Sequence, residues 1–231
     1  MSDYTTIDLE TMTVRPGALS DAALLAEIEE IASTPPFEAS PWQELADLTK
    51  TPLRDFLAAM FTVRAHAWGE AEDFIILEDR GTPLGACAVF EPEPDARDRR
   101  PLRVDAVPRV GKLLGWSADR SSSVIDAFES YWPLAYTDFL KPQAPAIIEC
   151  VAVLPHARGR GLGKRLMREA ALKAQRAGHD AIGISVIEGN ITAQRLYEAS
   201  EFEVVATFSA AYFEHRHPGV IKYRKRLHPS R

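Results

Sequence analysis

The spacing of apolar positions along the chain predicts strands interleaved with helices. Apolar runs without a helical period predict strands at 11–15, 74–77, 84–90, 147–154, 181–187, 202–208 and 220–227. Apolar positions at three- and four-residue steps predict helices at 21–28, 52–68 and 162–177. This order indicates an α/β protein of the α+β type, in which helices cover a mixed sheet, and excludes an all-helical or all-β domain.

Residues 92–145 interrupt this order between two predicted strands. The segment is rich in proline at its ends, basic from Arg97 to Lys112, and predicted to be helical from Ser121 with a break at Pro133. Its apolar stripe consists of Val124, Phe128, Tyr131, Trp132, Ala135 and Phe139. We therefore expect a single domain over residues 1–231, with 92–145 as a partly helical insertion. A lid over a substrate and a peripheral packing or dimer element are both open interpretations.

Composition narrows the class of function. The 231 residues carry a formal net charge of −6, which argues against nucleic-acid binding because such proteins normally show a basic surface. No apolar run approaches the roughly 18 residues of a membrane span, and no secretory signal pattern is present. Cys87 and Cys150 both lie in predicted strands, so we expect free thiols and a cytoplasmic protein. The six histidines show no spaced ligand set, so we expect no metal site.

The most informative segment, residues 153–164, runs from a predicted strand through a glycine-rich turn into a helix. A nucleotide P-loop is excluded, because Arg158 replaces its first glycine and Arg165 replaces its magnesium-binding hydroxyl. The dinucleotide fingerprint fails as well, since Lys164 stands in place of its third glycine. Glycines and a helix N-terminus still favour a phosphate ligand, because both present backbone N–H groups to an anion. An ordinary basic turn is the alternative interpretation.

A second segment follows about thirty residues later, where residues 190–198 read Asn-Ile-Thr-Ala-Gln-Arg-Leu-Tyr-Glu. Asn190 is a good helix N-cap. If the helix starts there, its 3.6-residue period places Asn190, Ala193, Gln194 and Tyr197 on one face. That face is predicted to meet one ligand.

The two segments together resemble the GNAT superfamily of N-acetyltransferases. The first supplies the pattern Arg-x-x-Gly-x-Gly through Arg158, Gly161 and Gly163, and the second resembles the family's Asn-x-x-Ala-x-x-Leu-Tyr-Glu helix. The family expects Gly-Phe next, where this chain has Glu201 and Phe202. This departure lies at the helix exit, where a left-handed glycine is usual, and not on the ligand face.

The resemblance implies a GNAT acyl-CoA N-acyltransferase fold, with a helical insertion before the cofactor-binding strand and acetyl-CoA as co-substrate. It assigns cofactor binding to residues of the strand, the loop and the later helix: Val151, Ala152 and Val153; Arg158, Gly159, Arg160, Gly161, Leu162, Gly163 and Lys164; and Asn190. It also implies that Tyr197 is the general acid for the departing thiolate. A half-buried packing tyrosine is the alternative for Tyr197.

Glu149 is a carboxylate inside an otherwise apolar strand. Strand alternation predicts that its side chain shares a face with Val151 and Val153. If the carboxyl group is buried, its pKa rises, which suits a general base acting on an amine directly or through water. An ion pair with a neighbouring strand is the alternative.

We therefore expect an enzyme, an N-acetyltransferase that moves an acetyl group from acetyl-CoA directly to a primary amine of a small molecule. A protein N-terminus or lysine as acceptor, a different acyl donor, and a non-catalytic coenzyme A sensor are the alternatives. The presence of both Glu149 and Tyr197 argues against the sensor. The sequence fixes neither the acceptor nor the oligomeric state, and it leaves a homodimer open.

Overall fold

The structure is a computed structural model that describes residues 12–132 and 137–228. Its described strands form one sheet in the order β1-β2-β3-β4-β5-β7-β6. Neighbours run antiparallel except β4 and β5, which are parallel. The strands are β1 (Met12–Pro16), β2 (Phe74–Asp79), β3 (Thr82–Phe90), β4 (Ala146–Val153), β5 (Ala181–Ile187), β6 (Glu203–Phe208) and β7 (Val220–Arg226). The predicted mixed α/β architecture is confirmed.

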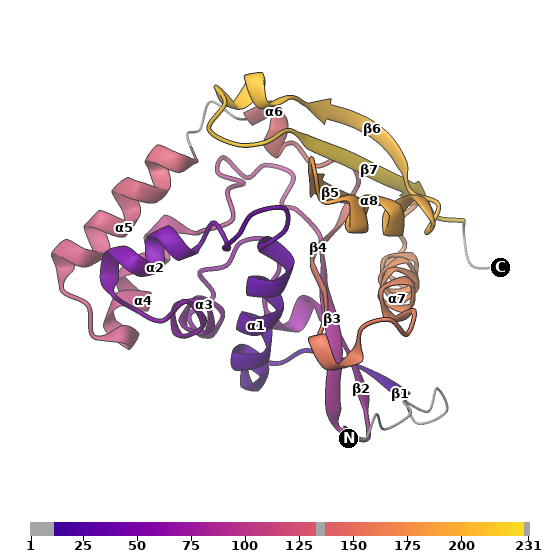
Figure 1. Cartoon of the computed structure of the whole chain (residues 1–231), viewed down its shortest axis with the longest axis horizontal. Coiled ribbons are helices and arrows are strands. Elements are labelled where there is room, and N and C mark those ends of the chain that lie inside the picture. The colour runs from indigo at the N-terminus through magenta and orange to yellow at the C-terminus, as the bar shows by residue number, and fades with distance from the viewer. Residues whose placement is uncertain (1–11, 133–136, 229–231) are drawn as a thin grey trace.

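Helices cover both faces of the sheet (Figure 1). They are α1 (Ala22–Ser33), α2 (Gln43–Thr49), α3 (Leu53–Thr62), α4 (Val107–Leu114), α5 (Ala118–Tyr131), α6 (Thr137–Leu140), α7 (Leu162–Arg176) and α8 (Ile191–Glu198). Helix α1 packs on β3 and β4 from one side, and α7 packs on β2, β3 and β4 from the other. Below, these sides are called the α1 face and the α7 face.

Helix α7 follows the predicted period closely. Its buried residues recur at helical spacing, so one stripe of the helix faces the sheet. They are Leu162, Leu166, Met167, Ala170 and Ala174. The helix begins directly after the glycine-rich loop, whose placement relative to β4 is therefore fixed by the core.

Helix α3 ends earlier than its apolar period predicts. The expected helix over 52–68 stops at Thr62, because Arg64 takes the left-handed conformation at φ +58°. The Ala65 N–H donates to the Met60 carbonyl oxygen at 2.8 Å, which closes the helix as a Schellman cap does. Glycine normally fills this position, so an arginine there gave no stop signal.

The insertion between β3 and β4 contains α4, α5 and α6. Helices α4 and α5 pack on α2 and α3 and share a hydrophobic cluster with them that includes Phe56, Leu57, Met60, Val110 and Phe128. Helix α5 begins at Ala118, before the predicted Ser121, because Ser117 caps it. The predicted break at Pro133 and the stripe residue Ala135 lie outside the described residues, as does Thr11. Helices α4 and α5 of the insertion thus pack in the helical layer, and other insertion residues line a cavity, so both interpretations of the insertion stay open.

Replacing Phe128 with alanine is expected to lower the free energy of unfolding by about 3–5 kcal/mol, since its side chain belongs to this cluster and is 1% exposed. Urea unfolding followed by circular dichroism measures the loss. The exposed Asp126 on the same helix provides the control, and its alanine variant should change stability by no more than about 0.5 kcal/mol. A Phe128→Ala loss as small as the control's would show that the insertion is peripheral to the core.

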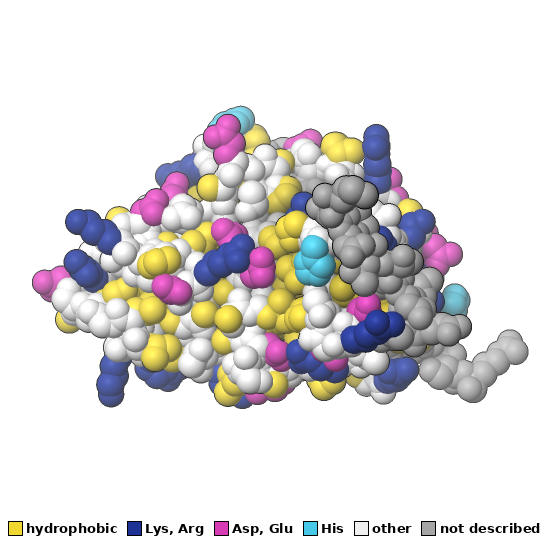
Figure 2. Space-filling model, turned by 60° about the horizontal axis from the view of Figure 1, so that its bottom comes forward, with side chains coloured by type: hydrophobic (Ala, Val, Ile, Leu, Met, Phe, Trp, Pro, Cys, Tyr) yellow, Lys and Arg dark blue, Asp and Glu magenta, His cyan; other side chains and the backbone are white. Residues whose placement is uncertain are grey.

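In the part of the chain that the structure describes, no helix combines the length and apolar character that crossing a bilayer requires. On the face that Figure 2 shows, positive and negative side chains are scattered among hydrophobic ones.

Candidate active site

Strands β4 and β5 separate after a short parallel stretch. They pair only at Ala146–Ile182, Ile147–Gly183 and Ile148–Ile184, whereas β4 pairs with β3 as far as Val153. Beyond Ile148, one edge of β4 therefore faces no other strand of the described chain. Backbone groups on such an edge can bind an extended ligand in the way that an added strand binds.

A bulge interrupts β4 at the start of this free edge. Ala86 and Ala88 of β3 pair with Ala152 and Glu149, so one residue of β3 lies opposite two residues of β4. Cys150 is one of these two, and its φ of +55° is left-handed. An inserted residue of this kind disrupts the alternation of side chains along the strand.

The predicted face of Glu149 is therefore wrong. Residues paired across antiparallel strands point to the same face, and Ala88, the partner of Glu149, packs in the cluster on the α1 face. Val151 and Val153 pack against the cluster on the α7 face. Glu149 thus lies on the α1 face, opposite the two valines, because the bulge intervenes.

The carboxyl group of Glu149 has an altered acidity. Burial, with a further contribution from the carboxylate of Glu29, raises its pKa to about 8, although Lys222 opposes the shift. An acid with this pKa is present in both protonation states near neutral pH, as proton transfer at that pH requires.

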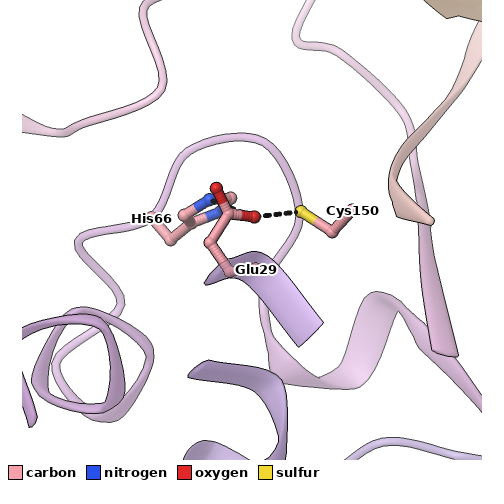
Figure 3. A group of neighbouring side chains, drawn as sticks. All are labelled: Glu29, His66 and Cys150. Carbon is pink, nitrogen blue, oxygen red and sulfur yellow. Dashed lines mark hydrogen bonds and ion pairs between the residues drawn. The ribbon is translucent and has the colours of Figure 1, made fainter. Parts of the chain in front are cut away.

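Next to Glu149 lies a buried polar network (Figure 3). Glu29 Oε1 accepts a hydrogen bond of 2.6 Å from Trp42 Nε1. Glu29 Oε2 accepts one of 2.6 Å from Cys150 Sγ and lies 3.7 Å from His66 Nε2. His66 Nδ1 contacts the Gly69 carbonyl oxygen at 3.1 Å. Burial alone would raise the pKa of Glu29, but His66 and the two donors hold that pKa below its usual value. The network therefore anchors Cys150, and with it the bulge.

Glu29, His66 and Cys150 are also a group of metal-ligand types, whose ligand atoms lie within 4.8 Å of one another. The sequence showed no such set, because the three residues come from α1, from the loop after α3 and from β4. Both cysteines are free and buried, as expected.

The glycine-rich loop occupies the end of β4 and the start of α7. Gly159 and Gly161 have φ of +77° and +74°, and a Cβ at either position would meet nothing within 4 Å. Arg158 Nε donates to the Val153 carbonyl oxygen at 3.2 Å, which ties the loop to the strand. An open loop at the N-terminus of a 15-residue helix suits a bulky anion such as a pyrophosphate.

Several predicted cofactor-binding residues have side chains that face the core. Leu162 and Ala152 are buried in the two sheet clusters, so only their backbone groups are available to a ligand. A Cβ on Gly163 would lie 3.1 Å from Leu196 Cδ2, so this glycine lets α7 approach α8. Lys164 is exposed beside the loop.

A cavity of about 1080 Å³ is lined by residues from both faces of the sheet, among them Glu149 and Cys150 from the α1 face and Val151 and Tyr197 from the α7 face. Among the predicted site residues, Glu149, Val151, Asn190 and Tyr197 line it, while loop residues 158–164, all of them described, lie outside its lining. The structure thus places the two predicted catalytic side chains at one cavity and the loop at a separate site along β4.

Helix α8 positions Asn190 and Tyr197 as its sequence suggests. The Asn190 side chain accepts a hydrogen bond from the Ala193 N–H at 3.2 Å, which confirms the predicted N-cap. Tyr197 is 6% exposed and packs on Phe202 and Tyr223, with ring centroids 6.4 and 5.8 Å away. Burial, with a contribution from Glu149, raises the pKa of Tyr197, so the phenol keeps its proton near neutral pH.

Two cavity residues, Glu29 and Lys222, were missed although the sequence carries a signal for each. Glu29 lies four residues after the buried Leu25 on the apolar stripe of α1. Lys222 lies two residues after the buried Val220, so alternation directs it inward. A charged residue at an inward position of a predicted element was the signal in both cases.

The sequence model of the acetyltransferase (GNAT) family matches residues 39–202. This chain belongs to the GNAT family of acetyltransferases. The GNAT chain is accordingly an acyltransferase enzyme of the acetyl-CoA-binding fold. The match spans the insertion, the open edge of β4, the glycine-rich loop and α8. No curated protein matches the chain.

Solved structures show the same fold. An acetyltransferase crystal structure is 17% identical with a TM-score of 0.60, covering 94% of this GNAT chain and 100% of its own. The yncA protein of Salmonella typhimurium, whose structure holds its cofactor acetyl-CoA, is 17% identical with a TM-score of 0.52, covering 95% and 96%. A mosquito arylalkylamine N-acetyltransferase like 5b is 16% identical with a TM-score of 0.51, covering 94% and 100%. Identities this low show the fold alone.

Proposed function

We propose that the enzyme transfers an acetyl group from acetyl-CoA directly to the primary amine of a small molecule. The observation that carries the proposal is the meeting of Glu149 and Tyr197 at one cavity beside the open edge of β4. A proton acceptor and a proton donor at one cavity are what direct amine acylation needs.

Cofactor binding and proton transfer would take place at two different sites of the chain. The loop from Arg158 to Lys164 and the N-terminus of α7 would hold the phosphates of acetyl-CoA, and the free edge of β4 from Val151 to Val153 would hold its extended arm. Asn190 would border that arm at the start of α8. When bound, acetyl-CoA supplies the acetyl group as an activated thioester.

Proton transfer would fall to the two side chains at the cavity. An aliphatic amine with a pKa near ~10 is protonated at neutral pH and must lose a proton before it can act as a nucleophile. A Glu149 oxygen would accept that proton, directly or through water. The Tyr197 hydroxyl would hold the proton that a departing thiolate needs.

A small acceptor fits the shape of the cavity better than a protein chain does. Helix α2 contributes Leu45 and Leu48 to its wall, and the insertion contributes Phe128 and Trp132. These walls favour an enclosed ligand over an extended peptide that needs an open groove. A protein N-terminus or lysine is the second candidate acceptor.

The test is a thiol-release assay with acetyl-CoA against polyamines, amino acids, arylalkylamines, aminoglycosides and short peptides, beside calorimetric binding of acetyl-CoA. Turnover with a small amine and none with peptides is the expected result. Turnover with peptides alone would overturn the choice of acceptor. Tight binding of acetyl-CoA without turnover on any acceptor would favour the sensor.

Replacing Tyr197 with phenylalanine is expected to lower kcat by about 10²-fold, because the variant keeps the ring but loses the proton donor. The affinity for acetyl-CoA should change little, since the glycine-rich loop is untouched. Steady-state thiol release and calorimetry separate the two effects. Full turnover by Tyr197→Phe would remove the general-acid role.

A further inference from the structure

Lys222 of β7 is a buried ammonium group at the cavity wall. It is 5% exposed, and its Nζ donates to the Lys141 carbonyl oxygen at 2.6 Å. The same nitrogen lies 5.3 Å from the ring centre of Phe139 and 5.6 Å from that of Phe208. These contacts hold the ammonium group without neutralising its charge.

Lys222 and Glu149 lie on one face of the sheet. Lys222 pairs with Ser185 of β5, which also lines the cavity, whereas the next residue, Tyr223, packs in the cluster on the α7 face. Lys222 therefore points to the α1 face, as Glu149 does. Because β5 lies between β4 and β7 in the sheet, the two side chains come from the strands on either side of β5.

Two other cations of the cavity wall have carboxylate partners. Arg100 pairs with Asp98 at 2.6 Å, and Arg103 pairs with Glu70 at 2.8 Å. No carboxylate oxygen of the described residues lies within 4.0 Å of Lys222 Nζ. Arg99 and Lys173 also lack such a partner, but both are partly exposed, whereas Lys222 is buried. Buried charges are normally paired, so an unneutralised ammonium at a cavity wall calls for an anion from a ligand.

Lys222 and Glu149 interact electrostatically. Glu149 opposes the lowering of the pKa of Lys222 by burial, and Lys222 opposes the raising of the pKa of Glu149 by burial.

We propose that the acceptor is an amino acid or a similar molecule with a carboxylate next to its primary amine, and that Lys222 binds the carboxylate while Glu149 faces the amine. The inference rests on the proposed acetyl transfer and names its substrate class. It also accounts for a buried ammonium group on the same face of the sheet as the candidate base. A carboxylate that reaches Lys222 would gain a charge-assisted hydrogen bond in a site shielded from water.

The experiment compares each amino acid with its decarboxylated amine and its amide, for example phenylalanine, phenethylamine and phenylalaninamide, in the thiol-release assay. The expected result is a kcat/KM about 10–100-fold higher for the amino acid than for the matched amine. The Lys222→Met variant keeps the length and apolar stem of the side chain. In this variant the preference for the amino acid should disappear, while the matched amine that lacks a carboxylate is still acetylated.

Lys225→Met is the matched control, because Lys225 is on the same strand but binds Glu201 and the Ser200 carbonyl oxygen. It should keep the preference for the amino acid. Arg99→Met is a second comparison, because Arg99 also lines the cavity and its Nε has no hydrogen-bond partner in the described chain. A preference that survives Lys222→Met but is lost in Arg99→Met would overturn the assignment to Lys222.

The two proposals fail in different ways. Turnover of amines with no advantage for the carboxylate would overturn this inference and leave the acetyl transfer intact. Absence of turnover with every amine, with the enzyme folded and acetyl-CoA bound, would remove the proposed function itself.

Discussion

Replacing Glu149 with glutamine is expected to lower kcat by about 10²–10⁴-fold, the range that general-base catalysis contributes. Glutamine keeps the shape of the side chain but cannot accept a proton from the acceptor amine. Binding of acetyl-CoA should stay close to wild type, because the glycine-rich loop lies outside the cavity that Glu149 lines. Thiol-release rates and calorimetry, measured on the same preparations, test both parts.

The pH profile provides the sharper readout for Glu149. Its pKa of about 8 means that the basic form is scarce at pH 6 and accumulates as the pH rises through 8. The rate should therefore rise with pH and level off above that value. In Glu149→Gln, the part of the pH-dependent rise in rate that comes from ionisation of Glu149 should vanish. Any rise in rate that is left then reflects deprotonation of the acceptor amine.

The control is Glu91→Gln, since Glu91 lines the same cavity but is mostly exposed and pairs with His179. It should keep the wild-type rate and profile. If Glu149→Gln also keeps them, the proton acceptor is another group. If Glu149→Gln and Glu91→Gln both lower the rate without changing its dependence on pH, the loss comes from removing negative charge at the cavity and not from proton transfer.

Much of the fold follows from the periodicity of the sequence. The strand predicted at 181–187 has those bounds in the structure, and the helix predicted at 162–177 ends one residue earlier. Helix α7 buries a regular stripe against the sheet, and β5 is buried along most of its length, so local pattern and packing agree. The short helices α2 and α4 were not predicted, because a helix of two turns offers too few positions to show a period.

The bulge in β4 marks the limit of reasoning from alternation. Period-two patterns assume that every residue advances the strand by one step, and Cys150 breaks that assumption. Neither glycine nor asparagine marks the position. What holds Cys150 there is its hydrogen bond to Glu29, 121 positions earlier in the chain, and such a contact has no local signature. The sequence therefore identified Glu149 as a candidate but placed it on the wrong face.

The electrostatics of the site depend on the same long-range contacts. Burial is the main cause of the raised pKa of Glu149, Glu29 adds to it, and Lys222 opposes it from the far side of β5. The pKa of this base thus depends on its burial and on side chains from α1 and β7, which lie on either side of β4 in the sequence. This explains why the loop motif and the α8 motif could be recognised locally, whereas the tuning of the base could not.

Replacing Gly161 with glutamate is expected to weaken acetyl-CoA binding by at least ~100-fold, because it places a like charge where the loop would receive phosphates. Gly161 is the N-cap of α7 at φ +74°, so the substitution also costs about 1–2 kcal/mol of backbone strain. That strain must be separated from the effect on binding. Calorimetric titration with acetyl-CoA, beside the thermal unfolding midpoint, measures the two effects.

Gly178 offers the control for strain alone. It follows the other end of α7, has φ +88°, and would also place a Cβ in open space. Gly178→Glu should therefore lower the unfolding midpoint by a similar amount while binding acetyl-CoA like the wild type. Equal weakening of binding in both variants would mean that strain, and not the loop, governs affinity. Normal binding in Gly161→Glu would place the phosphates elsewhere, because a carboxylate at the loop could not coexist with them at close range.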